Sequence, residues 1–426
     1  MRTRKQRLTI LFSAAGLLAV LSTAGAVAAA GAEAGPVPDG DDATAANLRE
    51  ALELGALGID LRYRLEWVDD AAFDKNALAS TLRAALAYET GSLHGFFAGV
   101  TFETVTAIGN DELYNNLGAG DLGNGVTDRP VVADPAIVEV DHLFLGWRGP
   151  RGLGLKAGRF AYTLDNQRFI GIAPWRQNHR SYEALSFEIG SPSTLKARYA
   201  YLARAYFNTG ANPELEGHLL HLSRALGPAS ASAYAYLLDW EAADRSALSS
   251  ATYGLRVVGE TELRPVDLLW FGEYARQLDH GDNPRDFSLD YAHLGLGVRR
   301  GPWTVQGAWE LKDGNGTSAV QTPLGTNHGL NGFADKMVVT PPDGSHDFYV
   351  RVAMDLARWS WLVDYHDFRA ARGGAELGTE VDLQARWAAT GSLAFWLKVA
   401  HYMADTWSTD VTKVMLWTTW SFDTTF

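Results

Sequence analysis

The sequence predicts an all-β fold, a transmembrane antiparallel up-and-down β-barrel of about 18 strands with short periplasmic turns and long extracellular loops. Three observations favour it. Segments of alternating apolar and polar residues recur from residue 57 to the end of the chain, and the connections between them alternate in length. No run of 18 apolar residues follows residue 30, so no transmembrane helix is expected. This combination is typical of bacterial outer-membrane barrels.

The first 30 residues have the pattern of a secretory signal peptide. A basic start precedes an apolar stretch at 8–21, and Ala28-Ala29-Ala30 is a small-x-small cleavage site. Residues 31–56 are rich in Ala, Gly, Pro and Asp, which predicts a flexible periplasmic leader with one short helix around 47–54. The expected organisation is a cleaved signal peptide (1–30), a leader (31–56) and an outer-membrane barrel (57–426).

The first barrel segment alternates most clearly. From Ile59 to Trp67 every odd position is apolar and every even position is charged. Successive side chains of a strand point to opposite faces, so one face is apolar and the other is ionic. A charge on the lipid face costs about 2–4 kcal/mol at the bilayer midplane. The charged face is therefore expected to line the lumen.

Further segments of the same kind follow in order. The 18 strands are expected at 58–68, 77–90, 95–106, 138–148, 153–160, 181–190, 193–204, 217–226, 231–240, 251–260, 267–278, 288–299, 302–312, 347–357, 358–368, 378–388, 393–403 and 412–426. Short turns lie at 91–94, 149–152, 191–192, 227–230, 264–265, 301–302 and 390–392. Long connections lie at 107–137, 161–180, 205–216, 241–250, 279–287 and 313–346. Only a closed sheet of such strands leaves no unpaired backbone in lipid.

Aromatic residues gather at the ends of these segments, as in the belts at the two membrane–water interfaces. The expected belt residues are Tyr63, Trp67, Trp147, Trp240, Trp270, Trp303, Trp309, Trp359, Trp361, Trp387, Trp417 and Trp420. The alternative for each is an ordinary core position. The last segment ends on Phe426, which resembles the signal that the barrel-assembly machinery recognises. The expected location is the outer membrane of a Gram-negative bacterium, and the expected partners are its lipid, its lipopolysaccharide and that machinery.

Composition excludes several functional classes. The net charge of −13 argues against a nucleic-acid partner, which would require a basic surface. The absence of cysteine excludes disulfides and metal sites built on thiolates. The connection at 107–137 is rich in Asn and Asp, but its spacing matches no EF-hand loop. We expect no metal ion and no cofactor.

The face assigned to the lumen carries charges of both signs. They include Asp60, Arg62, Arg64, Glu66, Glu103, Arg198, Glu273, Glu310, Glu380 and Asp382. One interpretation is a lattice of ion pairs that fills and stiffens the wall. The other is a surface that selects the ions passing through the lumen, and both can hold.

The connection near 159–180 is the most informative one. Four arginines and five amide or acid side chains fall within 22 residues: Arg159, Asp165, Asn166, Gln167, Arg168, Arg176, Gln177, Asn178 and Arg180. Such density of hydrogen-bonding groups predicts a loop folded into the lumen and narrowing it. The planar donor fork of arginine suits carboxylates, which uronic-acid polymers carry. Alternatively, the acid and amide groups satisfy the arginines and hold the loop rigid.

A second unusual connection runs from Thr322 to Pro342. It mixes polar, aromatic and proline residues, which predicts an ordered extracellular lid. The residues singled out in it are Asn327, His328, Asp335 and Lys336.

Several motifs resemble the alginate-export porin family. They are the stretch from Thr163 to Gly171, Trp175-Arg176-Gln177-Asn178, Gly325-Thr326-Asn327-His328, Ala334-Asp335-Lys336, and the stretch from Asp128 to Pro135. The resemblance runs from about 57 to 426. It implies an outer-membrane barrel of 18 strands whose lumen passes anionic polysaccharide through a constriction lined by basic residues. On this chain the implied lining residues are Arg159, Arg168, Arg176 and Arg180, with Arg62, Arg64 and Arg198 on the wall.

The function expected is passive diffusion of an anionic polysaccharide or oligosaccharide through an arginine-lined constriction. The mixed charge of the lumen favours an alternative, a general porin for sugars and small solutes, and a plugged structural or adhesive barrel is a further one. An enzyme is not expected, because no G-x-S-x-G elbow occurs. Asp141 and His142 are adjacent in a strand, so they are expected to face opposite ways and not to act together.

Overall fold

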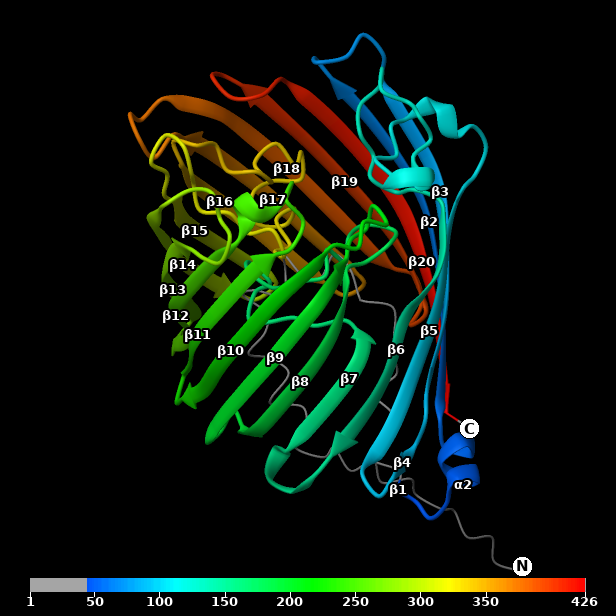
Figure 1. The fold of residues 1–426 in the computed structure, drawn as a ribbon. Coiled ribbons are helices and arrows are strands. Elements are labelled where there is room, and N and C mark those ends of the chain that lie inside the picture. The colour runs from blue at the N-terminus through cyan, green and yellow to red at the C-terminus, as the bar shows by residue number, and fades with distance from the viewer. Residues whose placement is uncertain (1–43, 426) are drawn as a thin grey trace, which may run out of the picture.

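The computed structural model describes residues 44–425, and these form a closed β-barrel (Figure 1). The predicted signal peptide (1–30), the first part of the predicted leader (31–43) and Phe426 lie outside the described residues. None of the helices among residues 44–425 is long and apolar enough to cross a membrane.

Eighteen long strands make the wall. They are β2 (Ala56–Asp70), β3 (Ala77–Glu89), β5 (Phe96–Ala107), β6 (Ile137–Arg148), β7 (Gly154–Phe160), β8 (Ser181–Ser191), β9 (Leu195–Tyr206), β10 (Glu214–Leu226), β11 (Ala229–Trp240), β12 (Ser250–Leu263), β13 (Val266–Asp279), β14 (Ser288–Arg300), β15 (Trp303–Lys312), β16 (Ser345–Leu356), β17 (Trp359–Arg369), β18 (Glu376–Ala388), β19 (Leu393–Ala404) and β20 (Val411–Thr425). Short elements complete the described chain: β1 (Thr44–Ala45), β4 (Ser92–Leu93), α2 (Leu48–Glu53) and the 3-10 turns η3 (Asp111–Leu113), η4 (Gly120–Leu122), η5 (Pro150–Gly152) and η6 (Ser246–Leu248).

Each long strand pairs antiparallel with the next, and β2 pairs with β20 from Ala56↔Thr425 to Asp70↔Val411, which closes the sheet. The predicted fold class is confirmed, and each of the 18 predicted segments overlaps one strand. Both ends of the described chain lie at the end of the barrel that carries the short turns, here called the short-turn end (Figure 1). The opposite end carries the long connections and is called the long-loop end.

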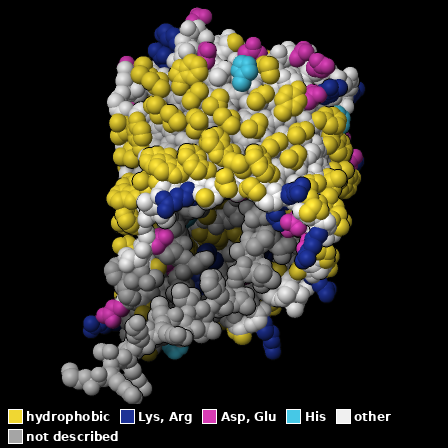
Figure 2. Space-filling view, turned by 180° about the vertical axis from the view of Figure 1, so that it is seen from behind, with side chains coloured by type: hydrophobic (Ala, Val, Ile, Leu, Met, Phe, Trp, Pro, Cys, Tyr) yellow, Lys and Arg dark blue, Asp and Glu magenta, His cyan; other side chains and the backbone are white. Residues whose placement is uncertain are grey.

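The outer surface carries a broad hydrophobic band, with charged side chains gathered toward the ends (Figure 2). This is the surface that a bilayer requires. Predicted belt residues on it include Tyr63, Trp303, Trp359, Trp361, Trp387 and Trp420, each at least 37% exposed. Trp240 and Trp417 were wrongly assigned to the belt, because their side chains are buried inside the barrel, at 1% and 6% exposure. The ring of Trp240 packs there near Phe207, and Trp417 stacks on Trp396.

A β-bulge overturns the expectation for Asp141 and His142. Thr101 pairs with His142 and Phe102 with Val140, which leaves Asp141 as the extra residue on β6. A bulge lets two successive side chains turn to the same face. Both residues are therefore buried, and Oδ2 of Asp141 lies 3.4 Å from Nε2 of His142.

Part of the predicted flexible leader is ordered. Asn47 caps helix α2 by accepting a hydrogen bond from the Glu50 amide, and the helix lies where the sequence predicts it. The hydroxyl of Tyr88 donates to the Leu52 carbonyl and the Gly91 amide donates to the Ala51 carbonyl, so the helix is tied to the short-turn end of β3.

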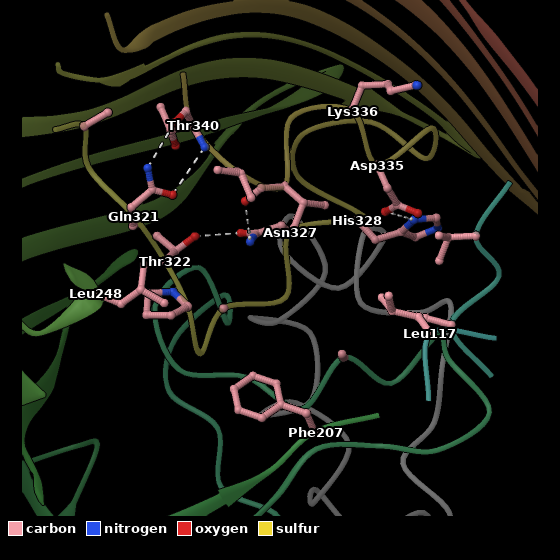
Figure 3. A pocket seen from close by; sticks show the side chains of 18 of the residues that line it. Leu117, Phe207, Leu248, Gln321, Thr322, Asn327, His328, Asp335, Lys336 and Thr340 are labelled. Carbon is pink, nitrogen blue, oxygen red and sulfur yellow. Dashed lines mark hydrogen bonds and ion pairs between the residues drawn. The ribbon is translucent and has the colours of Figure 1, made fainter. Parts of the chain in front are cut away.

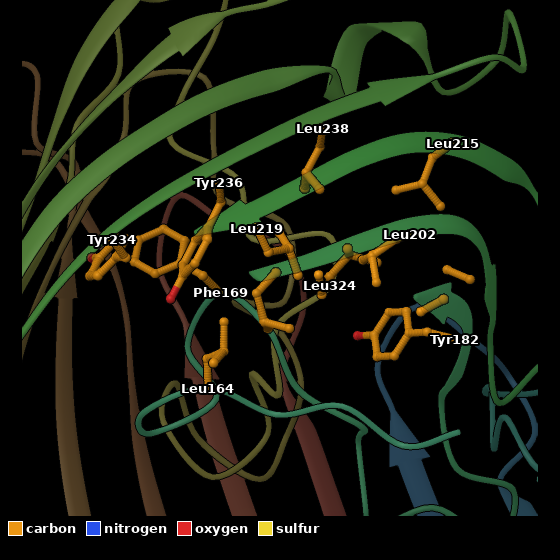
Figure 4. Close-up of a cluster of buried hydrophobic side chains, with 14 of the residues drawn as sticks. Leu164, Phe169, Tyr182, Leu202, Leu215, Leu219, Tyr234, Tyr236, Leu238 and Leu324 are labelled. Atoms are coloured by element: carbon orange, nitrogen blue, oxygen red, sulfur yellow. The ribbon is translucent and has the colours of Figure 1, made fainter. Parts of the chain in front are cut away.

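The lumen is filled rather than open. In a wall of 18 strands the inward side chains would ordinarily face water, yet Glu66, Glu380 and Asp382 are fully buried. Strands between β5 and β14 also contribute to a buried hydrophobic cluster, which includes apolar residues of two loops (Figure 4). The loop residues are Leu164, Phe169, Ile170, Ile172, Val320 and Leu324. Two connections from the long-loop end must therefore enter the barrel.

Candidate functional site

The two connections that enter the barrel are residues 161–180 and 313–344, together called the plug. They are joined through their backbones: the Gly171 amide donates to the Leu324 carbonyl at 2.8 Å, and the Thr326 amide donates to the Gln167 carbonyl at 2.8 Å. Nη1 of Arg180 adds a bond to the Gly325 carbonyl at 3.2 Å. The predicted loop inside the lumen is therefore present. The second loop is ordered, but the prediction of an extracellular lid is wrong, because this loop packs inside the barrel against the first loop and the wall.

Asp165, Asn166 and Gln167 shape the turn of the first loop. Asp165 and Gln167 have positive φ angles of 47° and 62°, and the Asn166 side chain accepts a bond from the Arg168 amide. The carboxylate of Asp165 bonds to His221 and Ser232 on the wall, at 3.0 and 3.1 Å. Burial alone would raise the pKa of Asp165, but the bond to His221 outweighs it and lowers the pKa below its ordinary value. These residues position the loop against the wall.

Arg168 lies at the centre of the plug and is 1% exposed. Its guanidinium is 2.6 Å from the Glu310 carboxylate on β15 and donates to the side chains of Asn327 and Asn331 at 3.1 and 2.7 Å. It therefore joins the two loops to each other and to the wall, and it is enclosed by its partners.

A second buried cluster gathers Arg176 with two wall arginines. The guanidinium of Arg176 lies 3.2 Å from the carboxylate of Glu66, and that of Arg64 lies 2.6 Å from the same carboxylate. Arg62 donates to the carbonyls of Pro174 and Arg176 at 3.2 and 3.0 Å. Arginine–carboxylate pairing of this kind is what the lattice interpretation predicts.

Gln177 and Asn178 continue the buried cluster. Nε2 of Gln177 donates to the Thr81 hydroxyl at 2.9 Å, and the Gln177 amide donates to Asp134 at 3.1 Å. Asn178 is 2% exposed. Gln177 therefore holds the first loop to the inner wall of β2 and β3.

Asp335 anchors the second loop to the same stretch of the inner wall, where β20 pairs with β2. Its carboxylate bonds to Nδ1 of His328 at 2.9 Å and to Nζ of Lys413 on β20 at 2.7 Å, and Arg176 lies 3.6 Å away. Lys336 bonds to Asp70 at 2.8 Å. Burial alone would raise the pKa of Asp335, but Lys413 and His328 outweigh it, so its pKa is lowered. Burial lowers the pKa of His328 well below 6.5, which keeps its imidazole neutral.

Two predicted arginines lie apart from the plug. Arg159 pairs with Glu139 on β6 and donates to the Ser181 hydroxyl at 2.8 Å. Arg198 lies on β9, 3.9 Å from Glu188, and lines a separate recess of about 410 Å³ with Lys156. The structure therefore places Arg168, Arg176, Arg180, Arg62 and Arg64 around one plug and leaves these two on the wall.

A cavity of about 880 Å³ opens above the plug, between the long loops (Figure 3). This space is called the vestibule. Its charged lining residues are Asp70, Arg176, Arg180, Arg245, Arg285, Asp335, Lys336 and Lys413, six basic and two acidic. Its apolar lining includes Phe207, Leu248 and Phe287.

The sequence analysis did not single out Arg245, Arg285 or Phe207, because each lies in a different long connection. The signal that could have revealed them is their placement at the long-loop ends of β9, β11 and β13. In an up-and-down barrel these ends meet around one rim. Among residues 44–425, no group of three His, Asp or Glu side chains is arranged to hold a metal ion.

Comparison with known proteins gives a family and a fold. A model of the family described as alginate export matches residues 54–293. No curated protein matches the chain.

Solved structures share the barrel. OpdK of Pseudomonas aeruginosa, determined with vanillate, aligns with a TM-score of 0.71 at 11% identity, covering 88% of this chain and 100% of that one. OccAB4 of Acinetobacter baumannii aligns with a TM-score of 0.68 at 13% identity, covering 89% and 100%. OpdO of Pseudomonas aeruginosa gives 0.66 at 15% identity, covering 88% and 99%.

Proposed function

The chain belongs to the alginate export family, and from this premise we propose that it is an outer-membrane channel for passive diffusion of anionic polysaccharide or oligosaccharide. The family and the fold are those of transport porins rather than enzymes. The membership suspected from the sequence motifs is thereby confirmed.

One observation carries the proposal. The vestibule, which is the open part of the interior at the long-loop end, has six basic lining side chains against two acidic ones. A cleft lined by one sign of charge raises the local concentration of counter-ions and draws them in. Basic side chains predominate in the vestibule lining although the whole chain has a net charge of −13.

Of the arginines expected at a constriction, Arg176 and Arg180 line the vestibule. They are the candidates for contact with the carboxylates of a passing sugar chain, since guanidinium forks bind carboxylates. Permeation requires sites that hold an ion and also release it. Arg168, Arg62 and Arg64 would act indirectly, by fixing the plug whose displacement opens the path.

Export, assembly and the lipid environment of the barrel are also part of the proposal. Residues 1–30 would direct export and be removed, and the C-terminal strand with Phe426 would be presented to the barrel-assembly machinery. Outer-membrane lipid and lipopolysaccharide would cover the hydrophobic band.

A second candidate function, a general porin for sugars and small solutes, is favoured by the mixed charge inside the wall. Carboxylates such as Glu66 and Glu310 lie beside the arginines and neutralise them. Such a lumen would offer no strong preference for polyanions.

The test is conductance of the refolded protein in a planar bilayer under a potassium chloride gradient. We expect an anion-preferring conductance that is blocked by oligouronate. A cation preference would replace the polyanion channel with the general porin. The complete absence of conductance would favour a plugged structural barrel.

A further inference from the structure

The arginines of the barrel interior fall into two electrostatic groups. Arg64, Arg168 and Arg176 each lie within 3.2 Å of a carboxylate. A paired arginine presents a dipole rather than a net charge, and its field falls steeply with distance. These residues therefore contribute little to the potential that a passing ion feels.

Arg180, Arg245 and Arg285 form the second group. All three line the vestibule, and none makes an ion pair with any residue of the described range 44–425. Arg180 bonds instead to the carbonyls of Gly171 and Gly325, and Arg285 bonds to the Thr317 carbonyl at 2.9 Å. Carbonyl partners orient a guanidinium without cancelling its charge.

Phe207 holds two members of this group together. The guanidinium carbons of Arg180 and Arg245 lie 4.7 and 4.9 Å from the centroid of its ring. Contacts of a guanidinium with an aromatic ring stabilise a like-charged pair that would otherwise spread apart. The neighbourhood of Phe207 therefore concentrates two uncompensated positive charges beside the cavity.

The acidic side chains nearby are engaged elsewhere or lie outside the cavity lining. Asp70 and Asp335, the two acids of the vestibule lining, are bonded to Lys336 and to Lys413. Asp244, Asp282 and Asp286 share connections with Arg245 or Arg285, but they do not line the cavity. The positive potential of the arginine group is thus left uncompensated in the vestibule.

We propose that Arg180 and Arg245, held at Phe207, form with Arg285 an anion-binding site in the vestibule that sets the charge selectivity of the channel. The chemical class it takes is a carboxylate, as on a uronate, and chloride in its absence. The proposal rests on the channel function proposed above and locates its selectivity in vestibule arginines that have no ion-pair partner among the described residues, rather than in Arg64, Arg168 and Arg176.

The test compares two triple variants with the same change in net charge. The first is Arg180→Gln/Arg245→Gln/Arg285→Gln. The control is Arg129→Gln/Arg358→Gln/Arg372→Gln, whose arginines also bond to backbone carbonyls but do not line the vestibule. Retention of the compact, heat-modifiable form on electrophoresis shows that each variant is folded.

Two measurements are made on each protein. Reversal potentials in a potassium chloride gradient should give a chloride-to-potassium permeability ratio that falls roughly threefold or more in the first variant and stays unchanged in the control. Calorimetric titration of the detergent-solubilised protein with D-glucuronate should show binding to the wild type and the control, and its loss in the first variant.

The outcomes separate the two proposals. An anion-selective wild type whose permeability ratio is the same in both variants would overturn the vestibule site and leave the channel function standing. A wild type without conductance would remove the channel function, and the titration would still decide whether the arginines bind a carboxylate. Failure of the wild type to bind glucuronate would overturn the site directly.

Discussion

The indole of Trp175 and the imidazole of His328 lie stacked, with ring centroids 3.5 Å apart and an interplanar angle of 10°. They come from different loops of the plug. Phe333 also stacks on His328, at 4.9 Å, while Arg176 lies over Trp175 and Lys398 of β19 lies over Phe333. This column of rings and cations runs from the first loop through the second to the wall. The two loops are therefore expected to leave the lumen together.

Substitution of Trp175 by alanine should loosen the plug. An aromatic pair contributes about 0.5–1.5 kcal/mol beyond burial, so the displaced state should become roughly twofold to tenfold more populated. Single-channel recording should show more frequent openings. Trp303→Ala is the matched control, because that tryptophan is 51% exposed on the outer surface. Equal opening frequencies in the two variants would mean that the column does not restrain the plug.

Acidic pH should favour the displaced plug. His328 is neutral in the docked loop because burial lowers its pKa well below 6.5, against the opposing effect of Asp335. Lys398 and Lys413 also face it and disfavour its protonation. A displaced loop regains a pKa near 6.5 and binds the proton, so docking is fully stable above pH 6.5 and weakens below it by about 1.4 kcal/mol per pH unit.

The measurement is opening frequency between pH 7.5 and 5.5. Asp335 does not act in this window, because its lowered pKa means that its contribution is lost only under much stronger acid. His179 of the first loop is also buried, and its pKa is also lowered well below 6.5. Its protonation at acidic pH therefore favours the displaced plug as well. We expect the pH response to fall by about half in His328→Gln and to vanish in His328→Gln/His179→Gln. An unchanged response in the double variant would assign it to groups outside the plug.

Removal of Arg168 should destabilise the whole barrel. A buried carboxylate that loses its partner costs about 3–5 kcal/mol, and Glu310 would be left in that state by Arg168→Met. Thermal loss of the folded band on electrophoresis should occur at a lower temperature. The double variant Arg168→Met/Glu310→Met removes both charges and should recover most of the loss. A double variant less stable than Arg168→Met would show that the pair does not dominate the energetics.

The alternation of residues predicts the wall well, because lipid on one side and polar groups on the other impose a period of two. It fails where the inner face is apolar. In β11, Tyr234, Tyr236 and Leu238 face inward and pack on the plug. Both faces of this strand are therefore apolar, and the sequence pattern does not distinguish the inner face from the outer one. The same effect misplaced Trp240. At β6 a one-residue bulge turns Asp141 inward, and no local sequence pattern predicts this bulge.

The candidate site was harder to predict than the wall. The density of arginine and amide groups at 159–180 indicated a loop in the lumen, and the loop is there. Which arginines are paired depends on carboxylates more than 100 residues away, as for Arg168 with Glu310 and Arg176 with Glu66. Such pairings arise from closure of the barrel, so the sequence could propose an arginine cluster but not its net charge.

A single methyl group at Gly332 should release the second loop. The residue has a φ of +87°, and a Cβ there would collide with the carboxylate of Glu380. That carboxylate accepts a bond from the Ala334 amide at 2.6 Å, so Gly332→Ala must displace either the acid or the loop. Loss of this anchor should expose the chain next to Lys336, which is held against Asp70 in the docked loop.

Trypsin cleavage after Lys336 is the readout for this change. Gly109→Ala is the control, since Gly109 has a φ of +96° and no atom within 4 Å of its Cβ position. Both substitutions impose the same left-handed strain of about 1–3 kcal/mol on an L-residue, but only one meets a wall carboxylate. Faster cleavage in Gly332→Ala than in Gly109→Ala would therefore report the lost contact itself. Equal rates would mean that the bond to Glu380 does not hold the second loop in the barrel.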